Sequence, residues 1–400
     1  MFAQAKIISK LDCICKYSLL LAIFVLPFSK ALMDIFITAT ILSWFLYRLS
    51  IGNFYGDKKY LFVIFGLFII VSSLSSINSG YPSEALRGTI RLFKFVLVAF
   101  ILSELATDPK WLKKLLYVAF LSYALVILDS LTQLFAGQDF IRGFSYQHGN
   151  SQVRLMGPFI SYGLLAAFLI AMTPIVAVFM LNNRSWIWKI VFAIFTLASI
   201  FLLYKTQSRG AWIASIVAWS AFSFFTRNRS IQIALIAILV VAPLVLPYNA
   251  LIHLDEFGKE QSLVERYYLW DRAVQVIRAK PLFGCGNNTF IKNYQKYDRT
   301  KNQRVPEYPA HNGFLQIAAG SGLIALGLFL VIIAMALKSG WRAFSNYTGE
   351  MKLLAAGLLT GFIALLCQGF IATTFHNPQS GLLLWLFVGL LISIEKWSTS

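Results

Sequence analysis

The sequence predicts an all-α membrane protein that crosses the bilayer many times. Hydrophobic residues make up 58% of the 400 residues and charged residues 13%, and the mean hydropathy is +0.69. A soluble domain carries about 25% charged residues. Apolar runs long enough for a bilayer-crossing helix, about 17 to 25 residues, recur along the whole chain. They are too long and too uniformly apolar for barrel strands, which alternate apolar and polar residues.

About twelve transmembrane spans are expected, each close to the ~20 residues that a helix needs. Lys and Arg gather at the N-terminus and in alternate short connections, which places those segments and both termini in the cytoplasm. The long loop 248–312 then faces outward, which in a bacterium is the periplasm. The expected spans cover residues 17–29, 31–47, 60–77, 90–105, 112–135, 157–181, 186–204, 211–225, 231–247, 313–337, 352–373 and 381–394.

Three regions follow from this topology: residues 1–247 with nine spans, the large outward loop 248–312, and residues 313–400 with three spans. The loop is expected to be partly helical. Ser262 and Glu265 have the spacing of a capping box, and apolar residues follow them at helical intervals. This pattern predicts an amphipathic helix that ends in the glycine-rich turn 280–288.

The outward side carries an excess of basic residues within a net charge of +18. Cations there oppose the insertion bias, so they are better interpreted as ligands for anions than as topology signals. Nucleic acid is the usual partner of a basic protein. Here the cations are spread over outward loops of a membrane protein, which favours a phosphorylated lipid or glycan and no nucleic acid. Acidic residues of the loop are scattered without histidine pairing, and no nucleotide-type glycine loop occurs, so neither a metal nor a nucleotide cofactor is expected.

Every even-numbered span of this topology begins at the outward face, with the positive end of its dipole there. Several of these starts carry a basic residue or a histidine: Arg91, Arg154, Arg209, His311 and His376. In the segment Ser208-Arg209-Gly210, the serine can cap the helix and the arginine can make a bidentate phosphate contact. An interfacial arginine that extends to lipid headgroups accounts for this segment equally well.

His311 and Asn312 stand where the long polar loop ends and an apolar helix begins. Asn312 can cap that helix, and the helix dipole then favours the neutral imidazole, which can act as a general base. A hydrogen-bonded interfacial histidine without a catalytic role is the alternative. His148 and His376 are expected to be structural or peripheral.

At these residues the chain resembles the O-antigen ligase and O-antigen polymerase superfamily of bacterial inner-membrane proteins. Three pieces carry the resemblance in order along the chain. They are Ser208-Arg209-Gly210, then the segments 266–273 and 281–286, then His311-Asn312 followed by Gly320 and Gly322. The resemblance covers roughly residue 154 to the C-terminus in sequence and the whole chain in topology.

The resemblance implies a GT-C-like glycosyltransferase of the bacterial inner membrane with its active site facing the periplasm. Ligases of the superfamily move a glycan from undecaprenyl diphosphate, which carries the O-antigen, to a sugar of the lipid A-core oligosaccharide. They invert the anomeric centre without metal or nucleotide. By this resemblance Arg209 and Arg266 grip the diphosphate, His311 activates the acceptor hydroxyl, and Arg272 is the alternative to Arg266. Secondary candidates are Arg91, Arg154, Ser208 and Asn312.

Two other functions stay open beside the ligase. One is O-antigen polymerase or protein O-oligosaccharyltransferase within the same superfamily, which differs in acceptor. The other is a transporter or flippase for an anionic lipid. A transporter favours internal repeats and helices broken at the midplane, which the sequence does not suggest.

Overall fold

The structure, a computed structural model, describes residues 2–53, 58–77, 79–146, 154–227, 229, 259–297 and 309–395. Across these residues it is all-α, as expected, and β pairing is confined to an isolated bridge between Gln138 and Ser145. The helices are α1 (Phe2–Val25), α2 (Lys30–Ile51), α3 (Lys59–Ile77), α4 (Pro82–Leu105), α5 (Pro109–Ala136), α6 (Tyr162–Asn182), α7 (Trp186–Lys205), α8 (Arg209–Thr226), α11 (Lys259–Ala279), α12 (Phe290–Tyr297), α13 (Gly313–Asn346), α14 (Gly349–Gly369) and α15 (Pro378–Ile394).

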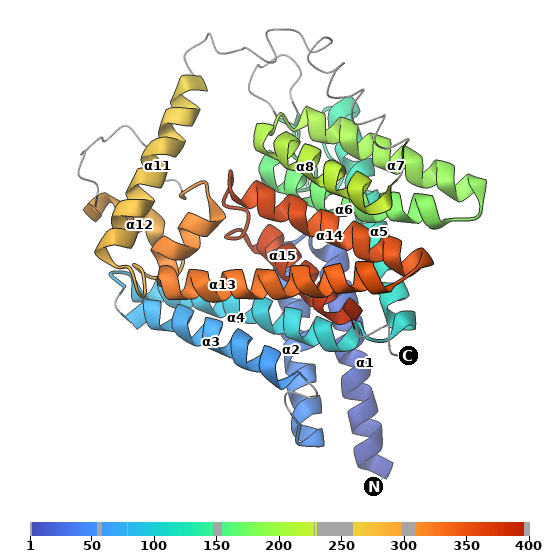
Figure 1. Ribbon diagram of the computed structural model, residues 1–400, viewed down its shortest axis with the longest axis horizontal. Coiled ribbons are helices and arrows are strands. Elements are labelled where there is room, and N and C mark those ends of the chain that lie inside the picture. The colour runs from blue at the N-terminus through green and yellow to red at the C-terminus, as the bar shows by residue number, and fades with distance from the viewer. Residues whose placement is uncertain are drawn as a thin grey trace.

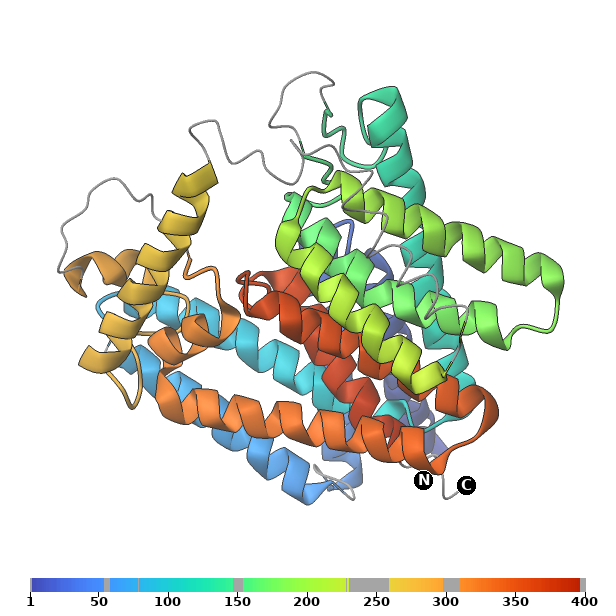
Figure 2. The same cartoon turned by 45° about the horizontal axis from the view of Figure 1, so that its top comes forward.

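The apolar helices form a bundle in which helices consecutive in the chain, such as α13, α14 and α15, run in opposite directions (Figure 1). Helices α4, α6, α8, α13 and α15 begin at the same end of this bundle, beside α11 and α12 (Figures 1 and 2). Helix α11 runs across that end instead of along the spans. The alternation predicted from charge therefore brings the N-termini of several spans to one end of the molecule, and we call it the α11 end.

The expected span 231–247 lies outside the described residues, and each of the others overlaps a helix. Seven of the described helices are long and apolar enough to cross a membrane, and α15 is a shorter apolar helix. Several boundaries were wrong: α1 begins at Phe2 and not at residue 17, α4 begins at Pro82 and not at residue 90, and α13 continues to Asn346 and not to residue 337. Arg91 therefore lies well inside α4 and not at its N-terminus. The first turns of α4 are polar, so the hydropathy pattern did not indicate where the helix begins.

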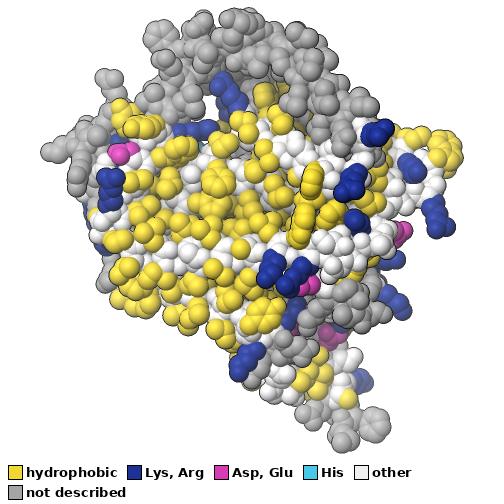
Figure 3. All heavy atoms as spheres, viewed as in Figure 1, with side chains coloured by type: hydrophobic (Ala, Val, Ile, Leu, Met, Phe, Trp, Pro, Cys, Tyr) yellow, Lys and Arg dark blue, Asp and Glu magenta, His cyan; other side chains and the backbone are white. Residues whose placement is uncertain are grey.

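Helices α6 and α15 are the most enclosed, with nearly every side chain buried. Small residues let their neighbours approach closely, as at many helix contacts within membranes. Gly357 and Gly361 of α14 are spaced as a GxxxG motif, and a Cβ atom at Gly361 would lie 2.3 Å from the carbonyl oxygen of Ala171 in α6. Apolar side chains cover much of the face on which α13 lies, and several Lys and Arg side chains lie toward the end opposite α11 (Figure 3).

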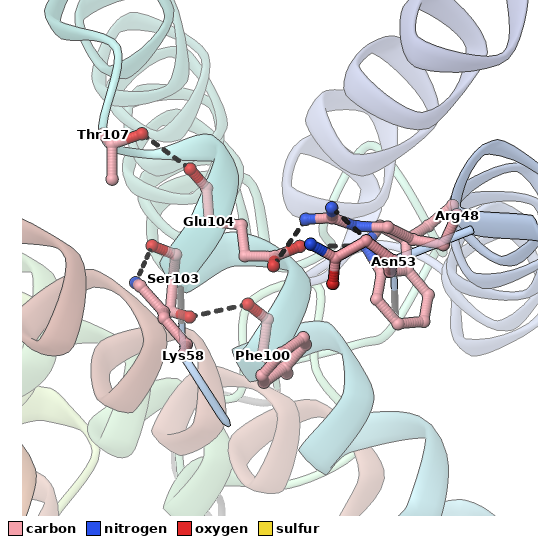
Figure 4. A network of polar contacts seen from close by, with 8 residues as sticks. Arg48, Asn53, Lys58, Phe100, Ser103, Glu104 and Thr107 are labelled. Atoms are coloured by element: carbon pink, nitrogen blue, oxygen red, sulfur yellow. Dashed lines mark hydrogen bonds and ion pairs between the residues drawn. The ribbon is translucent and has the colours of Figure 1, made fainter. Parts of the chain in front are cut away.

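A polar network ties the helices together at the end opposite α11 (Figure 4). Arg48 of α2 pairs with Glu104 of α4, with Nη2 and Oε1 2.6 Å apart, and Trp44 Nε1 donates to the same carboxylate at 3.0 Å. Lys58, just before α3, donates to the backbone carbonyl of Ser103. These contacts join the ends of α2 and α4 to the start of α3 through partly buried polar groups.

The start of α11 differs from the expectation. The helix begins at Lys259, three residues before Ser262, so Ser262 lies inside the helix and the predicted capping box is wrong as its N-terminus. The expected glycine-rich end is confirmed. Helix α11 ends at Ala279, and Gly284 and Gly286 in the following turn have φ of 68° and 116°.

Candidate active site

A cavity of about 420 Å³ opens at the α11 end of the bundle. It lies among the N-termini of α6, α8 and α15, and is also lined by His311 just before α13 and by the side of α11. The side chains that line it include Arg154, Tyr162, Ser208, Arg209, Arg266, His311, Gln368, Thr374, Asn377 and Ser380. Five residues singled out in the sequence are thus brought together from separate segments: Arg154, Ser208, Arg209, Arg266 and His311.

The cavity carries an excess of positive charge. Three guanidinium groups line it, and none of the described residues around it is acidic. Burial is the main cause that lowers the pKa of Arg266, and the charges of Arg154 and Arg209 lower it further. An arginine stays protonated in proteins, so the lowered pKa reports repulsion and lost hydration. An anionic ligand relieves both.

The N-termini of α6 and α8 add to this positive potential. Ser161 and Ser208 occupy their N-cap positions, yet neither side chain accepts a hydrogen bond from its own helix. The expectation that the Ser208 hydroxyl caps α8 is therefore wrong. Backbone N–H groups of a first turn without such a cap are donors that an anion can use. Gly210 allows close packing here, because a Cβ atom would lie 2.9 Å from the Ile371 side chain.

His311 is held at the cavity by its two neighbours in sequence. Asn312 is the N-cap of α13, as expected, and its Oδ1 accepts from the N–H groups of Phe314 and Leu315 at 2.9 and 3.0 Å. The buried N–H of Ala310 donates to Gln316 Oε1 at 2.9 Å. His311 itself has φ of 47°, a conformation that is uncommon for a residue with a side chain. Such strain persists only where the surroundings impose it, and it is frequent at functional sites.

The imidazole of His311 is in the form that a base needs. Burial lowers its pKa below the usual 6.5, and the charge of Arg266 lowers it further. The side chain is therefore neutral near pH 7. The sequence attributed this to the helix dipole, whereas the structure adds a desolvated position and a neighbouring cation as causes.

A set of backbone hydrogen bonds joins the segment after α11 to a break in α13. The N–H groups of Cys285 and Gly286 donate to the carbonyl oxygens of Ala319 and Gly320, both at 2.9 Å. The N–H of Leu323 donates to the carbonyl of Pro281 at 2.8 Å. We call these three bonds the backbone clamp. It connects the helix that carries Arg266 to the helix that follows His311.

The clamp explains the glycines of the family motifs. Gly322 has φ of 87° and interrupts α13, which frees backbone groups for the three bonds. A Cβ atom there would lie 2.0 Å from the carbonyl oxygen of Leu282, and one at Gly284 would lie 2.5 Å from that of Gly320. No side chain fits at either position. The glycines thus fix the relative placement of Arg266 and His311.

Tyr162 and the outer part of α5 are site features that the sequence interpretation missed. The Arg154 guanidinium lies 4.4 Å from the centre of the Tyr162 ring, within the range of a cation–π contact. Gln133 of α5 accepts from the N–H groups of Met156 and Gly157 at 3.1 and 2.7 Å, which places the loop that carries Arg154. The signal was present, because Asp129 and Gln133 are polar residues within an apolar span.

Other candidates lie elsewhere. Arg272 is buried, with its guanidinium 5.0 Å from the centre of the Tyr294 ring, and it does not line the cavity. Arg91 lines a second, smaller cavity together with His376. His148 lies outside the described residues.

Comparison with known proteins agrees with the resemblance that the sequence motifs indicated. A sequence model of the family described as O-Antigen ligase matches residues 194–330, a segment that contains Arg209, Arg266 and His311. The exopolysaccharide production protein ExoQ of Rhizobium meliloti (strain 1021) is 24% identical over 342 residues, which cover 80% of this chain and 74% of that protein. The expected resemblance is confirmed over this segment: the chain is an all-α membrane protein whose residues 194–330 match the O-antigen ligase family, which supports a ligase- or polymerase-type role in polysaccharide biosynthesis.

Proposed function

We propose that the chain transfers a glycan from undecaprenyl diphosphate to a sugar hydroxyl, and that the large cavity is its active site. The observation that carries this proposal is the composition of that cavity. Three arginines and a neutral histidine surround it, and no described acidic residue lines it. A glycosyl diphosphate presents two matching needs, a leaving group with several negative charges and an acceptor hydroxyl that must lose a proton.

The arginines and helix N-termini serve the leaving group. As the bond between the anomeric carbon and the diphosphate oxygen breaks, negative charge grows on that oxygen. Arg209 and Arg266 supply charged donors to the diphosphate, and Arg154 adds a third. Donors that are already in place when charge develops stabilise a transition state without further reorganisation. The donors of this chain therefore suit diphosphate departure without a metal.

His311 serves the acceptor. Its neutral imidazole takes the hydroxyl proton while the acceptor oxygen bonds to the anomeric carbon. Attack on the face opposite the departing diphosphate inverts that carbon in one displacement. The imidazolium that forms lies beside the anionic product, which stabilises it.

We assign the acceptor to the lipid A-core oligosaccharide in the bacterial inner membrane, with the loop 248–312 and the cavity on the periplasmic side and both termini in the cytoplasm. The basic residues in alternate connections support this orientation. A second candidate is a polymerase, whose acceptor is another lipid-linked glycan. The name of the similar protein ExoQ, which refers to exopolysaccharide production, favours that candidate.

Deletion of the gene and electrophoresis of the lipopolysaccharide test both candidates. Loss of the whole glycan ladder while lipid-linked glycan accumulates identifies a ligase. A band with one repeating unit identifies a polymerase. An unchanged ladder, together with unchanged exopolysaccharide and lipid-linked glycan, contradicts both.

A further inference from the structure

A second cavity lies beside the first at the α11 end, between α4, α13 and α15. It measures about 60 Å³, and its polar lining comes from Arg91, Asn287, Gln316, Ser321 and His376. His311 and Asn377 line the large cavity, whereas Gly313 and His376, their near neighbours in sequence, line the small one.

The small cavity presents donors that lack an acceptor. Arg91 is partly buried and forms no ion pair with any residue that the structure describes. The Asn287 Nδ2 group is buried and has no hydrogen-bond partner in the described part of the chain. Burial lowers the pKa of His376 to about 4, with Arg91 as the second cause, so the imidazole is neutral and adds no charge. An unpaired cation and an unsatisfied N–H group in a partly buried site are costly until an acceptor binds.

The small volume of the cavity suits a compact group such as one carboxylate or one phosphate. The aromatic side chains Phe95, Phe375 and Trp385 also line it, which lowers the local dielectric and strengthens a contact between Arg91 and an anion.

We infer that the small cavity binds one anionic group, a phosphate or a carboxylate, carried by the acceptor molecule. The anion site follows from the cavity itself, and its assignment to the acceptor rests on the proposed function. Gln316 connects the two cavities, because it lines the small one and its Oε1 accepts from the N–H of Ala310, next to His311. An acceptor held by its anionic group at Arg91 is thereby placed near His311, the proposed base.

Direct binding tests the site. The full-length protein in nanodiscs of phosphatidylcholine is titrated calorimetrically with methyl phosphate and, separately, with inorganic pyrophosphate. We expect Arg91→Gln to weaken methyl phosphate binding at least tenfold and to leave pyrophosphate binding unchanged. Arg209→Gln is expected to weaken pyrophosphate binding and to leave methyl phosphate binding unchanged. Unchanged methyl phosphate affinity in Arg91→Gln contradicts the small site, whereas unchanged pyrophosphate affinity in Arg209→Gln contradicts the proposed function, so the two failures are distinguishable.

Three further variants keep the test valid if Arg91→Gln folds poorly. Arg91→Lys retains the charge and is expected to keep part of the affinity for methyl phosphate. His376→Asn retains a polar side chain and is expected to weaken methyl phosphate binding less than Arg91→Gln. Wild-type affinity in a folded Arg91→Met variant contradicts the site as well.

A transfer assay identifies the source of the anion. Acceptor glycolipid from the source bacterium is used before and after phosphatase treatment and methyl esterification of its carboxylates. We expect Arg91→Gln to raise KM for the untreated acceptor about tenfold with little change in kcat or in KM for the donor. The treated acceptor is expected to serve wild type and variant equally. If the difference persists with treated acceptor and depends on phosphatidylglycerol in the nanodisc, the anion is a lipid headgroup and the assignment to the acceptor is wrong.

Discussion

Arg266 of α11 and His311 before α13 line the same cavity, and the charge of Arg266 helps to hold the pKa of His311 below its usual range. In the proposed mechanism, donor binding and the basicity of His311 are therefore electrostatically linked. A diphosphate at Arg266 would offset the charge that acts on His311. We therefore expect donor binding to raise the pKa of the imidazole and make it a stronger base.

This link predicts two different acid limbs in the pH dependence of the transfer reaction. The reaction needs neutral His311, so the rate falls as pH drops through the pKa of the imidazole. In the free protein that pKa lies below 6.5, which sets the limb of kcat/KM for the donor. In the donor complex the diphosphate favours the imidazolium, so the limb of kcat is expected at higher pH. Rates measured from pH 4.5 to 8 check this, and a kcat limb at or below the kcat/KM limb contradicts it.

Substitution of His311 is expected to abolish transfer while the protein still inserts and folds. His311→Asn is the sharpest variant, since asparagine tolerates the positive φ of 47° but cannot take up a proton. Loss of a general base lowers kcat by about 10² to 10⁴. His311→Ala is expected to behave alike in activity and to be slightly less stable. Near wild-type turnover of purified His311→Asn would falsify the role of His311 as base.

Arg209→Ala and Arg266→Ala are each expected to weaken donor use strongly. Each removes a charge-assisted contact worth about 1.5 to 3 kcal/mol, or roughly 10- to 150-fold in affinity. Lysine at either position is expected to restore only part, because it lacks the bidentate fork of arginine. Donor affinity and transfer rate of the purified variants are the measurements. Arg272→Met is the control on the same helix. It is expected to lower stability, because Arg272 is buried against Tyr294. The donor affinity of the folded fraction is expected to stay unchanged.

The backbone clamp predicts a contrast between two glycines of α13. A Cβ atom at Gly322 would lie 2.0 Å from a carbonyl oxygen and would need a left-handed conformation, whereas one at Gly327 meets nothing within 4 Å. Gly322→Ala is expected to separate the loop after α11 from α13 and to lower both thermal stability and transfer. Gly327→Ala is expected to be neutral or slightly stabilising. Thermal unfolding in detergent and the transfer assay check the pair, and equal behaviour of the two variants contradicts the clamp.

The sequence predicted the parts of this site that depend on topology. Alternation of the spans sends the starts of α6, α8 and α13 to one end, so Arg154, Arg209 and His311 were expected to share a face, and the cap at Asn312 is local in sequence. The sequence did not indicate that Arg91 lines a different cavity from these residues, because the order of spans does not tell which helices lie side by side.

Two of the arginines of α11 show the same limit of the sequence interpretation. Arg266 and Arg272 are six residues apart, and a helix of 3.6 residues per turn places them on different faces. One face meets the cavity and the other meets Tyr294 of α12. The partners of each face are distant in sequence, so the motif alone left both open. The backbone clamp was hidden for a related reason, since its bonds join main-chain atoms of two separate motifs.

Transfer is expected to survive EDTA and to need no added nucleotide. The reason is that three guanidinium groups and two helix N-termini in the large cavity supply the positive charge that a metal ion would otherwise provide. In the described part of the chain, no three His, Cys, Asp or Glu side chains form a group that could hold a metal ion. In the proposed reaction, the energy for transfer comes from the diphosphate of the donor itself.

The assay is transfer in liposomes with purified donor and acceptor, with and without chelator. Arg209→Ala serves as a second arm, because a site that relies on arginine for charge neutralisation gains from added Mg²⁺ only when an arginine is missing. We therefore expect Mg²⁺ to leave wild type unchanged and to restore part of the activity of the variant. If chelation stops wild-type turnover and Mg²⁺ or Mn²⁺ restores it, the chain has a metal site. Its ligands would then be sought at Asp271 on α11 and at Asp255 and Glu256, which lie outside the described residues.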